Sequence, residues 1–164
     1  IILFQNTNRK DGTTYMKAIN EMKLVFPSRS ANEAYARAAV AAFVSQLDPT
    51  VDELADLRTA ISEAVTNCIV HAYPDRIGDI TLTVRLYETG RVTVKIRDKG
   101  CGIEDVGLAM EPLYTTGGEE RSGLGFSVME SFTDRLRVVS HKGRGTVVTM
   151  EKYIMLRERQ ARQA

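Results

Sequence analysis

Residues 80–97, with the sequence ITLTVRLYETGRVTVKIR, constrain the fold of this chain more than any other stretch. Apolar and polar residues alternate on both sides of ETG, a pattern typical of two antiparallel strands joined by a tight turn. Because every second side chain of a strand points to the same face, one face of this hairpin is apolar and has to be covered. Residues 22–26, 135–140 and 145–153 predict further strands. The apolar residues of the hairpin are Ile80, Leu82, Val84, Leu86, Val92, Val94 and Ile96.

Helices can supply that cover. Two S/T-x-x-E capping boxes, at Ser30 and at Thr50, indicate helix starts. We expect helices over about residues 30–46, 50–71 and 123–132. Strands in one layer and helices in the other predict an α/β (α+β) two-layer sandwich, with a sheet covered on one face by helices.

The chain has no internal repeat and no long linker, so we expect one domain over residues 16–155. Residues 1–15 differ in composition, and we interpret them as upstream or added sequence, with Met16 as the natural start. Residues 156–164 form a polar tail.

The charge and cysteine content exclude several classes of protein. The net charge of +1 favours neither a nucleic-acid nor a membrane partner. No apolar run is long enough to span a membrane, and the initial IILF is too short for a signal peptide. Cys68 and Cys101 suggest neither a disulfide framework nor a metal cluster. We expect a reduced, cytoplasmic protein.

A polar row interrupts the apolar helix ISEAVTNCIVHAY of residues 61–73. Glu63, Asn67 and His71 recur four residues apart and border its apolar face. The row is either a solvated edge or the wall of a cleft. In a cleft, the carboxylate can orient or deprotonate a nucleophile, and the amide oxygen can bind Mg²⁺. One protein ligand is enough for Mg²⁺ if a nucleoside triphosphate and water supply the others.

Two glycine motifs follow. RDKGCGI contains Asp98, Gly100 and Gly102 after a strand, and it is either a tight turn or a place where Asp98 accepts a hydrogen bond from a ligand amine. RSGLGFSV places Gly123 and Gly125 before a helix, where backbone N–H groups can bind an anion. It is neither a Walker A motif nor a dinucleotide fingerprint. The intervening LYTTGGEE suits a lid.

The order of these motifs resembles that of the GHKL superfamily of ATP-binding domains, which have the Bergerat fold. Glu63 to Asn67 resembles its N box, and the two glycine motifs resemble its glycine boxes. The longer stretches FVSQLDPTVDELADLRTAISEAVTNCIVHAY, PLYTT and ERSGLGFSVMESF resemble the sporulation anti-sigma kinases of the sigma F type, over roughly residues 20–153. The GGEE segment of this chain looks shorter than theirs.

The resemblance implies an ATP-dependent protein-serine kinase that uses Mg²⁺. Glu63 would be the catalytic base, Asn67 the Mg²⁺ ligand, and Asp98 the acceptor for the adenine amine. Arg121 would act in catalysis near the γ-phosphate. The other expected contacts to ATP or ADP are Gly100, Gly102, Ile103, Thr115, Thr116, Ser122, Gly123, Leu124, Gly125 and Thr146. His71 fits the pattern, but we assign it no chemistry and interpret it as a buried residue at the helix end.

The resemblance also implies partners. The family forms homodimers, holds an RNA polymerase sigma factor and phosphorylates a serine of an anti-anti-sigma protein. Arg37 is a candidate contact to a partner, although the first helix can equally be a solvated surface. No direct nucleic-acid or membrane contact is expected.

Three alternatives remain at this point. A histidine-kinase ATP domain would normally accompany a phosphoacceptor histidine, and the chain has only His71 and His141. A general-stress anti-sigma kinase is closer. A nucleotide-gated sigma-binding module without phosphotransfer is the non-enzymatic alternative, and the presence of both Glu63 and Asn67 argues against it.

Overall fold

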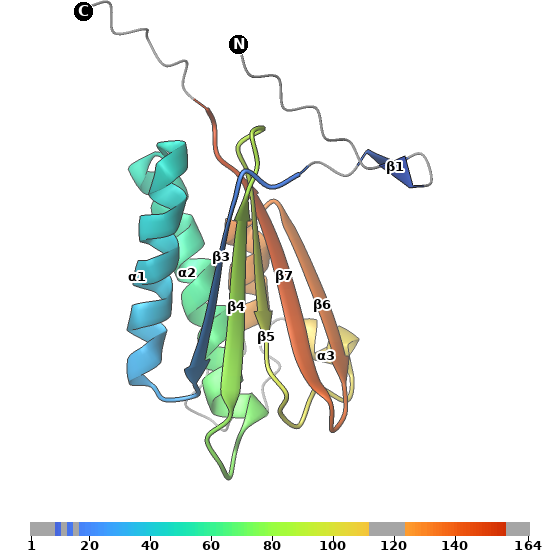
Figure 1. The fold of residues 1–164 in the computed structure, drawn as a ribbon. Coiled ribbons are helices and arrows are strands. Elements are labelled where there is room, and N and C mark those ends of the chain that lie inside the picture. The colour runs from blue at the N-terminus through green and yellow to red at the C-terminus, as the bar shows by residue number, and fades with distance from the viewer. Residues whose placement is uncertain (1–8, 11–12, 15–16, 112–123, 157–164) are drawn as a thin grey trace, which may run out of the picture.

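The computed structural model describes residues 9–10, 13–14, 17–111 and 124–156. Its main element is a five-stranded antiparallel sheet in the order β3-β4-β5-β7-β6 (Figure 1). The strands are β3 (Asn20–Pro27), β4 (Asp79–Leu86), β5 (Arg91–Arg97), β6 (Arg135–His141) and β7 (Gly145–Tyr153). Two very short strands, β1 (Arg9–Lys10) and β2 (Thr13–Thr14), pair separately.

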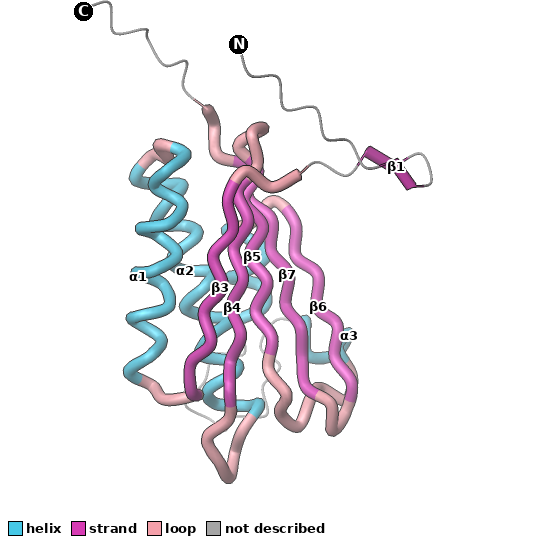
Figure 2. The backbone as a smooth tube through the Cα atoms, in the orientation of Figure 1, coloured by secondary structure: helices cyan, strands magenta, loops and turns pink. Residues whose placement is uncertain are grey.

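The predicted hairpin is confirmed. β4 and β5 pair in antiparallel register, and Gly90 donates its N–H to the carbonyl of Tyr87 in the turn. All seven of the alternating apolar side chains are buried. Their face forms the core together with the helices, and Figure 2 shows the helices gathered on one side of the sheet. The expected two-layer α+β sandwich is therefore confirmed.

The helical layer consists of long and short elements. The helices are α1 (Ala31–Val44), α2 (Val51–Asn67), α3 (Val106–Met110) and α4 (Gly125–Phe132). A 3-10 turn (Ser45–Leu47) follows α1, and a π-helical turn (Cys68–Ala72) follows α2.

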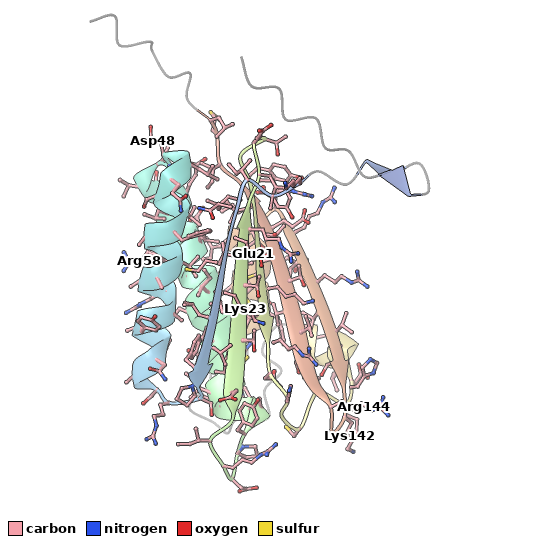
Figure 3. All side chains as sticks on the ribbon, in the orientation of Figure 1. Glu21, Lys23, Asp48, Arg58, Lys142 and Arg144 are labelled. Carbon is pink, nitrogen blue, oxygen red and sulfur yellow. The ribbon has the colours of Figure 1, made fainter. Side chains whose placement is uncertain are left out.

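Figure 3 shows Glu21 and Lys23 on β3, and the polar side chains of this strand and its neighbours line a shallow hollow on the sheet. Among the described helices, none is long and apolar enough to cross a membrane.

One of the two predicted capping boxes is confirmed. At the start of α2, the Glu53 N–H donates to Oγ1 of Thr50, and the Thr50 N–H donates to Oε2 of Glu53 at 2.7 Å. The box at Ser30 is wrong, because the Ser30 side chain makes no capping hydrogen bond. Glu33 instead accepts a hydrogen bond from the Ser62 hydroxyl at 2.7 Å, which ties α1 to α2.

The second helix extends to Ala72, close to its predicted end at about residue 71, but its last turn is not α-helical. The α-helix ends at Asn67, four residues before His71, and continues as a π-helical turn. This turn widens the helix, and the carbonyl of Ala72 accepts a hydrogen bond from the N–H of Cys101 at 2.9 Å. Single π turns of this kind often occur at functional sites. Here the turn fits the helix end to the glycine loop after β5.

Candidate functional site

The last two turns of α2 carry Glu63 and Asn67 of the predicted polar row, and His71 lies in the π-helical turn that follows. Glu63 and Asn67 are partly exposed, whereas Ala64 and Val65 between them are fully buried. This contrast follows from the helical period, because residues four apart share one edge and their neighbours point into the core. Glu63 and Asn67 therefore form the border of the core, as the sequence predicts.

The start of α4 lies directly against this border. A Cβ atom built on Gly125 would be 3.2 Å from Oε2 of Glu63 and 3.4 Å from the amide oxygen and nitrogen of Asn67. The first residue of α4 and the two side chains of α2 are thus in close contact. Two motifs that are about sixty residues apart in the sequence meet at one place, because α2 packs against α4 in the helical layer.

This contact surface has the chemistry of a phosphate and Mg²⁺ site. The N–H groups of the first turn of a helix have no partner within the helix and form its positive end. Leu124, the residue before α4, provides no side-chain cap. The first hydrogen bond of the helix runs from the N–H of Val128 to the carbonyl of Leu124. Asn67 adds a neutral oxygen, which suits a hard cation. The arrangement therefore fits a phosphate–Mg²⁺ group, with few protein ligands to the metal.

The described residues contain no group of three or more His, Cys, Asp or Glu side chains that could hold a metal. Asn67 could give Mg²⁺ one oxygen ligand, with a bound phosphate and water supplying others. Magnesium commonly binds in this way at nucleotide sites.

Asp98 lies at the end of β5 and is buried, with only 3% of its surface exposed. Its Oδ1 accepts the N–H of Gly100 at 2.9 Å and the N–H of Thr146 at 3.2 Å. Its Oδ2 accepts a hydrogen bond from the thiol of Cys68 at 3.7 Å. A buried carboxylate with backbone donors on one oxygen keeps acceptor capacity on the other.

Cys68 is the other buried member of this pair. Burial raises the pKa of its thiol well above the ordinary value, and the charge of Asp98 and the hydrogen bond to it act in the same direction. Cys68 therefore stays a neutral thiol that donates to Asp98. Its backbone is fixed as well, because its N–H bonds to the carbonyls of Ala64 and Val65.

The glycine loop after Asp98 is held between two other elements. Gly102 has φ = +71°, and a Cβ atom there would be 2.1 Å from the carbonyl oxygen of His141. A Cβ atom on Gly100 would be 2.0 Å from the carbonyl oxygen of Ala72. Both glycines are thus needed for close packing. Figure 3 shows Lys142 and Arg144 at the tip of the β6–β7 turn, which packs on this loop.

Ile103 and Thr146 lie near each other through a shared partner. The Ser140 hydroxyl accepts the N–H of Ile103 at 2.8 Å, and it hydrogen-bonds the Thr146 hydroxyl at 2.8 Å. Since Thr146 also donates its N–H to Asp98, one hydrogen-bond network joins Ile103, Ser140, Thr146 and Asp98. The structure thus brings together Asp98, Ile103 and Thr146, three of the residues for which the resemblance implies contacts to the nucleotide.

The other predicted residues comprise positions that the structure does not describe, the residue before α4 and one residue on α1. Thr115, Thr116, Arg121, Ser122 and Gly123 lie outside the described residues. Leu124 directly precedes α4. Arg37 lies on α1, where its Nε is 3.5 Å from Glu33, and its side chain is 39% exposed. None of the site residues above belongs to α1.

Sequence reasoning missed three contributors. Cys68 and Ser140 are polar partners of Asp98 and Thr146, and the sequence motifs assign no role to either residue. The hydroxyl of Tyr73 donates to the carbonyl of Asp79 and accepts the N–H of Lys99, so it joins the end of the helix to the residue after Asp98. The position of Cys68 next to Asn67 was the one available signal, because a π turn cannot be seen in the sequence.

Comparison with known proteins adds independent information. The family model of the histidine kinase-like ATPase domain matches residues 26–152. The anti-sigma F factor of Caldanaerobacter subterraneus is 54% identical over 140 residues, which cover 85% of this chain and 97% of that protein. The anti-sigma F factor of Clostridium botulinum is 55% identical over 135 residues, covering 81% and 94%.

Solved structures share the fold at lower identity. A Mycobacterium tuberculosis chain with RsbU and RsbW domains superposes with a TM-score of 0.61 at 20% identity, covering 82% of this chain and 32% of that one. A histidine kinase domain from Erythrobacter litoralis gives a TM-score of 0.52 at 22% identity, covering 74% and 60%.

The family model covers most of the chain, and a solved histidine kinase domain shares its fold, so the chain belongs to the histidine kinase-like ATPase domain family. Within this family, the chain belongs with the anti-sigma F factors, because it is 54% and 55% identical to the two relatives above over 97% and 94% of their lengths. The resemblance that the sequence motifs suggest is confirmed.

Proposed function

We propose that this chain is an anti-sigma factor that binds ATP with Mg²⁺ and transfers phosphate to a serine of an anti-anti-sigma protein. It would hold a sigma factor of the F type as a homodimer. The observation that carries the proposal is the contact between Gly125 and the pair Glu63 and Asn67. It brings a carboxylate, a metal-binding amide and the positive end of a helix to one point.

Each of these groups has a separate task. Asn67 would provide the protein's oxygen ligand to Mg²⁺, and the amides at the start of α4 would bind phosphate oxygens. Bound Mg²⁺ would neutralise the charge on the transferring phosphate. Asp98 would accept the exocyclic amine of adenine, because the backbone amides of Gly100 and Thr146 hold its carboxylate.

Glu63 would act on the incoming serine. Its carboxylate would accept the hydroxyl proton while the serine oxygen forms a bond to the γ-phosphorus and the bond to the leaving ADP breaks. Its position beside α4 supports this role, because the base must lie next to the phosphate site. Arg121 would stabilise charge at the same phosphate.

The test is phosphotransfer followed by intact-mass spectrometry. The protein is mixed with Mg·ATP and a candidate anti-anti-sigma protein, and the phosphorylated residue is located by peptide sequencing. We expect one added phosphate on serine. ATP binding without any added phosphate would contradict the kinase role and favour a nucleotide-gated binder.

Glu63→Gln tests the base. It should retain ATP binding, measured by calorimetry, and its rate of phosphotransfer should fall by about a hundredfold or more. Glu130→Gln makes the same chemical change at an exposed position of α4 and should leave transfer intact. Equal transfer rates for both variants would contradict the base assignment.

The partners need their own measurements. Light scattering of the protein alone should give twice the chain mass, and addition of a sigma F-type factor should give a stable larger complex. Arg37→Ala should weaken that complex without changing ATP binding, if α1 is the contact surface. An unchanged complex would remove Arg37 from the proposal.

A further inference from the structure

Cys68 and Asp98 form a buried hydrogen-bonded pair between the end of α2 and the end of β5. Within the part of the chain that the structure describes, Oδ1 of Asp98 has two backbone donors, and Oδ2 has the thiol of Cys68 as its partner at 3.7 Å. A carboxylate oxygen accepts about two hydrogen bonds, so Oδ2 keeps capacity for one further donor. One acceptor position of Oδ2 thus remains available, and the hydrogen bond from the thiol orients the carboxylate.

We propose that Cys68 is a positioning residue that orients the carboxylate of Asp98 toward the exocyclic amine of a purine. This inference rests on the proposed nucleotide site. An amino group on carbon 6 of the purine donates to the remaining lone pair of Oδ2. A purine that carries only hydrogen on carbon 6 makes no such bond. Cys68 would therefore raise the preference for a 6-aminopurine without touching the base.

The surroundings of the thiol support this role. Cys68 is 5% exposed and Asp98 is 3% exposed, so water does not compete freely for their hydrogen bond. The π-helical turn that begins at Cys68 and the bonds of its N–H to α2 fix the position of its backbone beside Asp98. Without the thiol, Oδ2 would face a buried space with no fixed donor, and the carboxylate could rotate.

The test compares two nucleotides in calorimetric titrations of the full chain with Mg²⁺. One is ATP, and the other is purine riboside triphosphate, which lacks only the 6-amino group. For the unmodified protein we expect ATP to bind about tenfold or more tightly than the analogue. Cys68→Ala should weaken ATP binding by about three- to tenfold and change analogue binding by less than about twofold.

Three further variants separate positioning from packing. Cys68→Ser keeps a donor and should restore most of the preference. Cys68→Val fills the space without a donor, should behave like Cys68→Ala, and serves in its place if the alanine variant does not fold. Val65→Ala removes a buried side chain from the same helix and should leave the ratio of the two affinities unchanged.

The outcomes are distinct. A smaller ATP-to-analogue ratio in Cys68→Ala and Cys68→Val, restored in Cys68→Ser, supports the inference. Equal weakening of both nucleotides, or no change in either, overturns it while the nucleotide site stands. If the unmodified protein binds neither nucleotide, the proposed function itself fails, and the role of Cys68 fails with it.

Discussion

Gly125 lies against Glu63, so closely that a Cβ atom on residue 125 would be 3.2 Å from Oε2 of the glutamate. This single contact joins the polar row of α2 to the start of α4. The nearest atoms belong to the ends of side chains, not to the backbone, so a larger residue at this position would displace the functional groups before it disturbs the fold.

Gly125→Ala should therefore separate stability from activity. Alanine is a better helix former than glycine by up to about 1 kcal/mol, so the free energy of unfolding should stay equal or rise slightly. Phosphotransfer should fall by about tenfold or more, because small displacements of catalytic groups have large effects on rate. Thermal unfolding and the intact-mass time course measure the two effects. A variant with full activity would show that Glu63 does not need its present position.

Asp98→Asn should abolish tight nucleotide binding with little loss of stability. The asparagine oxygen can still accept the amides of Gly100 and Thr146, but its NH₂ group would face the amine of the base instead of a carboxylate oxygen. We expect ATP affinity to fall by about tenfold or more. Calorimetry measures the affinity, and circular dichroism measures the fold. Asp52→Asn, at an exposed position in the first turn of α2, is the matched control and should bind ATP normally.

Gly102→Ala should destabilise the fold more than Gly143→Ala. Both glycines have positive φ, +71° and +74°, so both substitutions carry a backbone cost of roughly 1 kcal/mol. Only at Gly102 does a Cβ atom meet the carbonyl oxygen of His141, at 2.1 Å, whereas at Gly143 nothing lies within 4 Å. Urea unfolding of the two variants isolates the steric part. Equal losses would mean that the loop can move away from β6 freely.

Much of this architecture could be predicted from the sequence, because it depends on local periodicity. Strict alternation identified β4 and β5 and their buried face, and the helical period placed Glu63 and Asn67 at the edge of the core. The glycine motifs identified the loop after β5 and the start of α4. Each of these signals lies within one element.

The rest depended on contacts between elements. No capping box forms at Ser30, and Glu33 instead accepts a hydrogen bond from Ser62 on another helix. The π turn at Cys68 and the bond from its thiol to Asp98 depend on the packing of α2 against the loop after β5. Nothing in the local pattern marks Ser140 as a partner of both Ile103 and Thr146. Such tertiary hydrogen bonds override local propensity and leave no periodic trace.

The capping box of α2 gives a pH-dependent prediction. Burial raises the pKa of Glu53, but hydrogen bonds from the N–H groups of Met155 and Thr50 and from the Thr50 hydroxyl, and the charge of Lys152, outweigh this effect and lower the pKa below its ordinary value of 4.5. A carboxyl group with a lowered pKa in the folded state stabilises the fold above its unfolded pKa. That contribution is lost as the pH falls through the folded pKa.

Glu53→Gln should therefore reduce the free energy of unfolding at pH 7 and flatten its decline between pH 5 and pH 3, since glutamine does not titrate. Thr50→Ala should lower stability by about 1 kcal/mol at every pH through loss of the cap, and it should keep most of the acid dependence because the backbone donors to Glu53 remain. Urea unfolding followed by circular dichroism across this pH range measures both. Parallel curves for Glu53→Gln and the unmodified protein would show that another carboxyl group governs the acid sensitivity of the fold.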